Sequence, residues 1–298
     1  MTILCSPSCD RWTERFVPVV PGVKSVFERE PTALELSRVE RTMEILRNRY
    51  ERWTRWHYAR MLNEVRNAVL EMDHVPDDLE MALILRPFEE QQRSVLRRLY
   101  LQIYPEAASL VIPDDTLKSI RAGREVKELS LEQQRILQWI EETIGMSITD
   151  ISRTTLDLIR DLWNQSTDTN DFYRRLRNDT HFTTSRAATI ARTEAQCACT
   201  MSQYIMAGEL SFGRPMEVTW HNSGLGEVRA WHKVMDGQSV PYNELFRVPK
   251  RKGGYDLMYC PGDRSHGASG ENIINCRCFF TTTYLDRVPT LVYNRNPN

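Results

Sequence analysis

The segment TALELSRVERTMEILRNRYERWTRWHYARMLNEVRNAVLE, residues 32–71, decides the class of the fold. Its large apolar residues recur at steps of three and four positions, with arginine and glutamate between them: Leu34, Leu36, Val39, Met43, Leu46, Tyr50, Trp53, Trp56, Tyr58 and Met61. This period places the apolar side chains along one face of a helix. We therefore predict one long amphipathic helix that ends before Asp73-His74-Val75-Pro76, because a residue that precedes proline disfavours the helical conformation.

Further helical segments follow, and we predict them at residues 78–104, 130–145, 147–163, 169–178 and 183–207. Ser130-Leu-Glu-Gln133 has the pattern of a capping box, which opens a helix. We expect Gly145 and Gly208 to end the helices that precede them, because glycine is common just after a helix. We expect Thr169 or Asn170 to cap the short helix.

The character of the sequence changes after Gly208. Glycine and proline become frequent, and Val218-Thr219-Trp220 and Phe279–Tyr284 have the composition of strands. The fold class that we predict is a mainly α N-terminal region followed by a small α+β C-terminal module. The corresponding segments are an extended arm at 1–31, a helical domain at 32–180, the α+β module at 181–285 and a tail at 286–298.

Composition narrows the class of function. The chain has 298 residues, is 41% hydrophobic and carries a net charge of -1. A protein that binds nucleic acid over its whole surface would be basic. No run approaches ~20 apolar residues, so we expect no membrane partner, and the start of the chain lacks the pattern of a signal peptide. The seven cysteines occur in small clusters that are typical of free thiols or metal ligands.

Four short motifs follow one another between residues 190 and 278. They are Ile190-Ala191-Arg192-Thr193-Glu194, Arg229-Ala-Trp-His232-Lys-Val-Met-Asp236-Gly237, Cys260-Pro261-Gly262-Asp263 and Asn275-Cys276-Arg277-Cys278. In order, spacing and residue type these motifs resemble the phage Mu F-like head morphogenesis family. The resemblance covers about residues 183–285. Each motif is weak alone, and the four in order make the resemblance specific.

This resemblance implies a structural minor head protein of a tailed phage rather than an enzyme. Such a protein lies in the virion, inside the capsid near the portal, after assembly in the host cytoplasm. It assists head assembly and DNA packaging or ejection. The expected partners are the portal protein, the major capsid protein and packaged double-stranded DNA, which arginine residues would contact through its phosphates without reading the sequence.

The polar residues of the motifs can also be interpreted by their spacing. Arg192 and Glu194 are two positions apart on a helix, so they point to different faces and each needs another partner. Arg229, His232 and Asp236 would line up on a helical turn, which Asp236-Gly237 would end. We expect the motif residues, including those of the Pro261-Gly262-Asp263 turn and Asn275, to be partly buried and to bond one another.

The cysteines of the last motif suggest a metal site. On a strand, Cys276 and Cys278 would share a face and present both thiolates to one ion. A closed zinc site needs four nitrogen or sulfur ligands, and Cys260 and His266 would complete it, with His232 as a replacement for His266. The alternative is that these residues are buried free thiols. Cys197 and Cys199 cannot share a face of a helix, and we interpret them as buried small apolar residues.

A catalytic alternative remains open at this point. His232, Asp236, His266 and Asn275 near an ion would suit a metal-dependent nuclease, in which the ion activates water. Relatives of the resembled module also occur beside toxin domains such as ADP-ribosyltransferases, which extends the alternative to an enzyme that acts on nucleotides. The sequence has no phosphate loop, no Gly-x-Gly-x-x-Gly and no Gly-x-Ser-x-Gly, and we expect no enzymatic activity.

Overall fold

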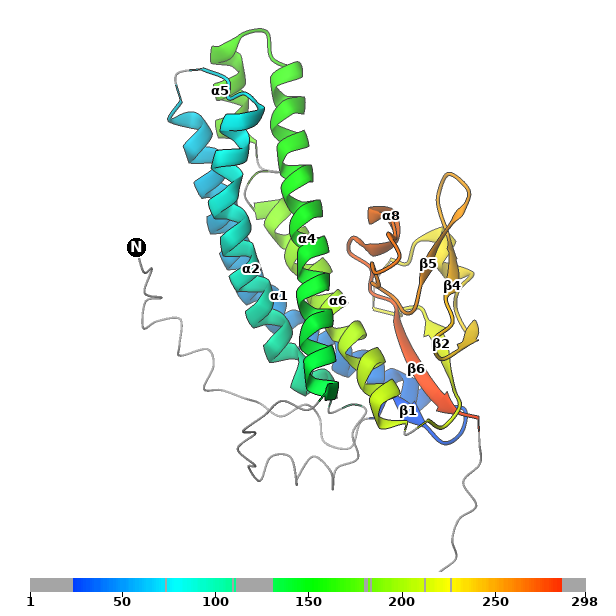
Figure 1. Cartoon of the computed structure of the whole chain (residues 1–298). Coiled ribbons are helices and arrows are strands. Elements are labelled where there is room, and N and C mark those ends of the chain that lie inside the picture. Colours follow the sequence, from blue (N-terminus) through cyan, green and yellow to red (C-terminus); the bar gives the residue numbers. More distant parts are fainter. Residues whose placement is uncertain are drawn as a thin grey trace, which may run out of the picture.

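The computed structural model describes residues 24–285 except 73, 109, 111–130, 180, 181, 183, 212 and 226. Long helices form a bundle, and a small strand-containing module packs beside one end of it (Figure 1). The helices of the bundle are α1 (Ala33–Leu70), α2 (Asp78–Ala108), α4 (Leu131–Asn164), α5 (Thr169–Asn178) and α6 (Thr184–Leu210). The predicted fold class, a helical region followed by a small α+β module, is confirmed.

The first helix begins and ends where its sequence pattern predicts. Thr32 and Glu35 form a capping box, in which the Thr32 side chain accepts from the Glu35 amide and the Glu35 carboxylate accepts from the Thr32 amide. Most of the predicted apolar stripe is buried, from Val39 to Met61. Leu34 and Trp56 are exceptions, since both are exposed.

Three expectations about helix ends are wrong. α4 is a single helix that continues through Gly145, because the apolar period continues beyond it in Ile148 and Ile151, which are buried. α6 likewise continues through Gly208 to Leu210. The cap of α5 is Asp168, whose side chain accepts from the Asp171 amide, and not Thr169 or Asn170.

The strands form a four-stranded sheet and a two-stranded sheet. The larger sheet has the order β1-β6-β2-β3, and the smaller one pairs β4 with β5. β2 and β6 are antiparallel, with Trp220 opposite Phe280, and both strands were predicted. The bounds are β1 Val26–Phe27, β2 Met216–His221, β3 Ser239–Pro241, β4 Phe246–Pro249, β5 Tyr255–Met258 and β6 Phe279–Tyr284.

The segments predicted as a terminal arm and a tail fall mostly outside the described residues. Residues 1–23 of the arm and residues 286–298 of the tail are not described. The rest of the arm includes β1, which pairs in parallel with β6 and so adds an edge strand to the sheet of the module. Over the described part of the chain, no helix has both the length and the apolar character that a membrane crossing requires.

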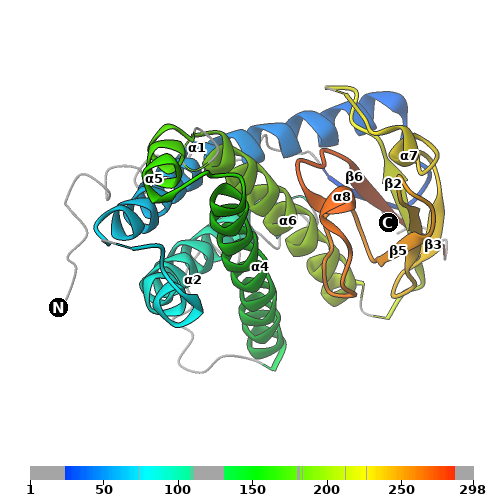
Figure 2. The same ribbon diagram turned by 90° about the horizontal axis from the view of Figure 1, so that it is seen from above.

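α6 joins the bundle to the module. In the view of Figure 2 it lies between the other long helices and the strands. Ala195 and Ala198 belong to the core of the bundle, whereas Met201 and Tyr204 belong to the core of the module around Trp220. The candidate site lies in this second core.

Candidate metal centre

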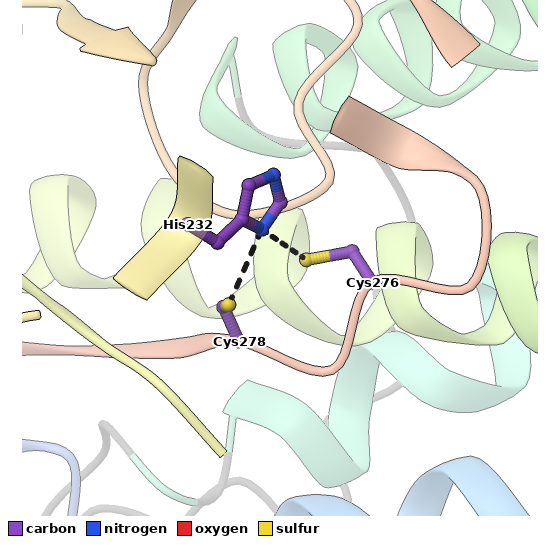
Figure 3. A group of neighbouring side chains, drawn as sticks. All are labelled: His232, Cys276 and Cys278. Carbon is purple, nitrogen blue, oxygen red and sulfur yellow. Dashed lines mark hydrogen bonds between the residues drawn. The ribbon is translucent and has the colours of Figure 1, made fainter. Parts of the chain in front are cut away.

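Three side chains from distant parts of the sequence meet in the core of the module. The ligand atoms of His232, Cys276 and Cys278 all lie within 4.8 Å of one another. His232 Nδ1 is 3.7 Å from Cys276 Sγ and 3.5 Å from Cys278 Sγ, and the ring faces both sulfur atoms (Figure 3). The three residues are only 1%, 3% and 2% exposed. The group can hold a metal ion.

Local backbone structure brings the two cysteines together. The short helix α8 (Gly270–Ile273) ends just before them, and Asn275 adopts a left-handed conformation with φ 55°. The Cys276 amide donates to the Ile273 carbonyl, which closes the turn. Cys278 lies immediately before β6. The pair therefore presents two sulfur atoms to one side of the loop, as their spacing predicted, although neither cysteine is within the strand.

Hydrogen bonds fix the orientation of the histidine. His232 lies on the short helix α7 (Ala230–Lys233), and its Nε2 is 3.0 Å from Asn272 Oδ1. The same oxygen accepts from the Trp231 indole at 2.8 Å. Because an indole only donates, the atom is the amide oxygen, and His232 Nε2 must then carry a proton. In the neutral ring Nδ1 therefore has the lone pair, and it points at the sulfur atoms as a metal ligand must.

Asn272 is the centre of this supporting network. Its amide nitrogen donates to Asp256 at 2.9 Å and to the Pro249 carbonyl at 3.1 Å. Asp256 also accepts from the amide and hydroxyl of Ser269. Asn272 is fully buried, so each of these bonds constrains it. The sequence did not identify Asn272 because its role depends on contacts with segments that lie 16 or more residues away.

The two thiols have opposite pKa shifts. A hydrogen bond from Cys278 lowers the pKa of Cys276, and the nearby His232 ring lowers it further against the effect of burial. The same hydrogen bond to Cys276 raises the pKa of Cys278, and burial adds to this increase. Ionisation of the Cys276 thiol is therefore favoured, and ionisation of the Cys278 thiol is opposed. A bound cation would remove that opposition, because it stabilises both thiolates.

The expected four-ligand site is not assembled. Cys260 is buried elsewhere in the same core, where its sulfur is 3.3 Å from Met201 Sδ, and burial raises the pKa of its thiol. His266 is exposed, bonds Ser265 at 2.9 Å and contacts the ring of Tyr259. Of the five residues expected near the ion, the structure brings together Cys276, Cys278 and the substitute His232, and it places Cys260 and His266 outside this group.

The physical reason lies in the loop between β5 and α8. Asp263 accepts from the amides of Tyr259 and Ser265, both at 2.8 Å, which shapes the Pro261-Gly262-Asp263 turn. Gly262 has φ 88° and packs against Cys197, where a side chain would be strained. These polar groups hold the loop in a path that places His266 at the surface.

Arg264, next to that turn, is a buried residue that sequence reasoning missed. Its guanidinium donates to Glu194 at 3.0 Å, to Cys197 Sγ at 3.3 Å and to the Ser147 hydroxyl. Ser147 also donates to Glu194, at 2.9 Å. The prediction that Arg192 and Glu194 have separate partners is confirmed, since Arg192 pairs with Glu51 at 3.0 Å. A single arginine after a turn carries no signal of burial.

The predicted helical alignment of Arg229, His232 and Asp236 is wrong. α7 has four residues and ends before Asp236, so the side chains do not follow one another along a helix. Arg229 donates to the Ile274 carbonyl, and the exposed Asp236 accepts from the Asn222 amide at 2.7 Å. Gly237 does form the expected turn, with φ 76°. These polar residues connect different loops and do not bond one another.

The remaining motif residues join the segments. The Asn275 amide donates to the Thr193 hydroxyl at 3.1 Å, which ties the last motif to α6. Cys197 and Cys199 are buried as predicted, and burial raises the pKa of each thiol to about 12.

The arrangement suits binding of an ion better than turnover of a substrate. Two sulfur atoms and one imidazole nitrogen meet in a buried core, and the histidine is oriented by a second layer of hydrogen bonds. Comparison of the chain with protein-family models, with curated proteins and with solved structures gave no match. Inference about function therefore rests on the sequence motifs and on this geometry.

Proposed function

We propose that the chain is a structural minor head protein of a tailed phage, bound inside the capsid near the portal, where it assists head assembly and DNA packaging or ejection. The proposal starts from the four motifs that resemble the Mu F-like head morphogenesis family. Portal protein, major capsid protein and packaged DNA are its proposed partners. The chain would act by binding and not by catalysis.

One observation carries the proposal: the four motifs converge in space. Thr193 of the first motif bonds Asn275 of the fourth, and His232 of the second faces both cysteines of the fourth. Gly262 of the third motif packs against α6 at Cys197. Residues spread over about 90 positions thus form one folded unit. This convergence supports treating the four motifs as parts of one module.

Zinc is the ion that we propose for the site. Two thiolates and one imidazole form a ligand set that zinc prefers, and the protonated Nε2 of His232 leaves Nδ1 available for it. His232, Cys276 and Cys278 would hold the ion. When bound, it would cross-link α7 to the loop before β6 and so contribute to the folding free energy of the module.

The burial of the ligands supports a structural role over the nuclease alternative. A nuclease must bring a phosphate to its metal. Three protein ligands leave the fourth position of a tetrahedral zinc to water, as in catalytic sites, so the burial of the ligands and not their number separates the two roles. His232, Cys276 and Cys278 are almost completely buried. Of the other residues considered for catalysis, Asp236 and His266 are exposed and take part in separate hydrogen bonds.

Virion analysis tests the proposed function. Gradient-purified particles of the source phage should contain the chain, and an amber mutation in its gene should yield defective heads. Particles that lack the chain would reject the proposal. Incubation of the pure protein with DNA and Mg²⁺, Mn²⁺ or Zn²⁺ tests the alternative, which requires cleavage that His232→Ala abolishes.

Metal analysis tests the zinc site separately. The purified chain should contain about one zinc per molecule, and chelation should lower its Tm. The double variant Cys276→Ser/Cys278→Ser should contain no zinc, and its Tm should not respond to the chelator. Cys199→Ala is the matched control, because Cys199 is equally buried but lies in the core of the bundle. Metal content that is equal in both variants would contradict the assignment.

A further inference from the structure

The hairpin of β4 and β5 presents one face to solvent. Phe246, Val248 and Met258 point into the core of the module, and the intervening residues Arg247 and Leu257 are exposed. β4 and β5 pair with each other and with no other described strand. The turn between them stands apart from the long helices, at the right of Figure 1. The hairpin is therefore an exposed two-stranded ribbon fixed to the core by one face.

Glycines give the turn a defined shape. Gly253 and Gly254 have φ 91° and 78°, a region that residues with side chains rarely adopt. The Gly253 amide donates to the Lys250 carbonyl, and the Lys250 amide donates to the Gly254 carbonyl, both at 3.1 Å. These bonds close the turn. The tip is thus a shaped feature of the module and presents its side chains in a fixed direction.

Positive charge is concentrated on this ribbon. Residues 247–252 read Arg-Val-Pro-Lys-Arg-Lys, which gives four cations in six positions in a chain whose net charge is -1. The nearest acid on the ribbon, Asp256, points inward, where it bonds Ser269 and Asn272 and lies 3.5 Å from Lys250. Arg251 and Lys252 are exposed and have no ion-pair partner among the described residues.

An aromatic ring lies beside these cations. The guanidinium of Arg247 stacks over the exposed ring of Tyr255, 4.0 Å from its centroid. This stacking fixes the orientation of the Arg247 side chain on the outer face of the hairpin, while its charge remains accessible to solvent. An arginine held in place can form paired hydrogen bonds to the oxygens of a phosphate. The ribbon thus presents one oriented cation on its face and two unpaired cations at its tip.

We propose that the β4–β5 hairpin is a contact surface for double-stranded DNA, which it binds through phosphates without reading the base sequence. The identity of the partner rests on the proposed function. The shape supports it, because a convex two-stranded ribbon fits a groove of a duplex with its cations toward the phosphate backbones. A lipid surface fits less well, since the exposed Tyr255 and Leu257 lie along the strand, and the tip at residues 250–254 has no apolar side chain that could insert first. An acidic peptide would meet the same cations without the two phosphate backbones of a duplex, and the test below includes it.

Fluorescence anisotropy of the full chain with a labelled 30-base-pair duplex tests the proposal. The charge-reversal variant Arg251→Glu/Lys252→Glu should bind at least 10-fold more weakly than the wild type at low salt, on the order expected for loss of two phosphate contacts. The dependence of log affinity on log salt concentration should fall by roughly 2. A duplex of scrambled sequence should bind equally well.

The matched control is Arg52→Glu/Arg55→Glu, which makes the same change in net charge at exposed positions of α1. It should bind nearly as the wild type does. The proposal is overturned if the hairpin variant binds like the wild type, if both variants lose affinity equally, or if poly-glutamate at the same charge concentration binds as well as the duplex. These binding results do not depend on whether virions contain the chain. The DNA-binding role of the hairpin can therefore be rejected while the proposed head-protein function is supported, or the reverse.

Discussion

At the scale of single residues, the most consequential contact is the ion pair between Glu194 and Arg264. The two side chains are 2% and 7% exposed, and they join α6 to the loop that follows β5. Ser147 on α4 bonds both partners. Isolated charges are costly in a protein interior, so each partner depends on the other. The pair specifies how three segments meet.

Removing one partner should therefore destabilise the chain strongly. Glu194→Leu leaves the guanidinium buried without its counter-charge and should lower the free energy of unfolding by about 3–5 kcal/mol. Arg264→Met should have a comparable effect. The double variant should lose much less than the sum, because neither charge remains unpaired. Urea denaturation of the four proteins gives the coupling, and additive losses would contradict the pairing.

His57 gives a prediction for pH dependence. Burial, with help from Arg98 and Arg60, lowers the pKa of His57 to about 4 from an ordinary value of 6.5. Between these values the unfolded chain binds a proton that the folded chain does not, so stability is full above pH 6.5 and falls as pH decreases toward 4. His57→Gln should lose less stability between pH 7.5 and pH 5 than the wild type does in urea denaturation. Equal losses would show that His57 does not contribute.

At the scale of helices, the glycines mark the limit of what sequence patterns predict. Gly145 and Gly208 were both expected to end helices, and both lie inside one. Near Gly145 the sequence held the answer, since the apolar period continues on both sides of it. Glycine occurs at position 208 for a different reason, because an added Cβ would overlap the Tyr242 hydroxyl. That contact joins residues 34 positions apart, and no local pattern reveals it.

The same substitution at these two glycines should have opposite effects. Gly145→Ala should stabilise the chain by about 0.5–1 kcal/mol, because alanine is the better helix former and no described atom lies within 4 Å of the added Cβ. Gly208→Ala should destabilise it by about 1–3 kcal/mol through the collision with Tyr242. Thermal denaturation measures both. Destabilisation by Gly145→Ala would mean that α4 is broken at that point.

The candidate site likewise contains residues whose positions follow from nearby sequence and residues whose positions depend on distant contacts. The pair Cys276 and Cys278 was predictable because the two residues are close in the sequence, although a turn at Asn275 and not a strand brings their sulfur atoms together. His232 was an alternative from the same motif set. Cys260 lies outside the group because its position depends on the loop around Gly262, whose path is set by Asp263 and the buried Arg264. Long-range hydrogen bonds decide such details, and spacing does not encode them.

At the scale of the whole molecule, the helical bundle and the module share elements. α6 contributes to both cores, and α1 reaches the module through the side chains of Glu40, Glu44 and Arg47. Glu40 accepts from the Ser223 hydroxyl and the Gly224 amide. Arg47 donates to Gln196 and to the Arg277 carbonyl, next to the two cysteines. Gln196 in turn donates to the Cys278 carbonyl at 2.7 Å. The candidate metal centre is therefore supported partly by the bundle.

This sharing predicts that the chain unfolds as one cooperative unit. A fragment of residues 181–285 would expose the face of α6 that contains Ala195 and Ala198, and it would lose Arg47 and Glu40 as partners of the module. We expect this fragment to aggregate or to lack dispersed amide signals in NMR spectra, even with zinc present. In the full chain, helix content, tryptophan fluorescence and zinc release should change at the same denaturant concentration.

The discriminating comparison is between residues 24–285 and residues 181–285. The longer fragment contains every described helix and strand, and it serves as the control that retains α1. If the shorter fragment alone folded, bound zinc and melted cooperatively, the module would be an independent domain with a boundary near residue 180. The contacts of α1 with the loops around the site would then contribute little. If residues 181–285 did not unfold cooperatively while residues 24–285 still bound zinc, α1 and α6 would instead be part of the candidate metal centre.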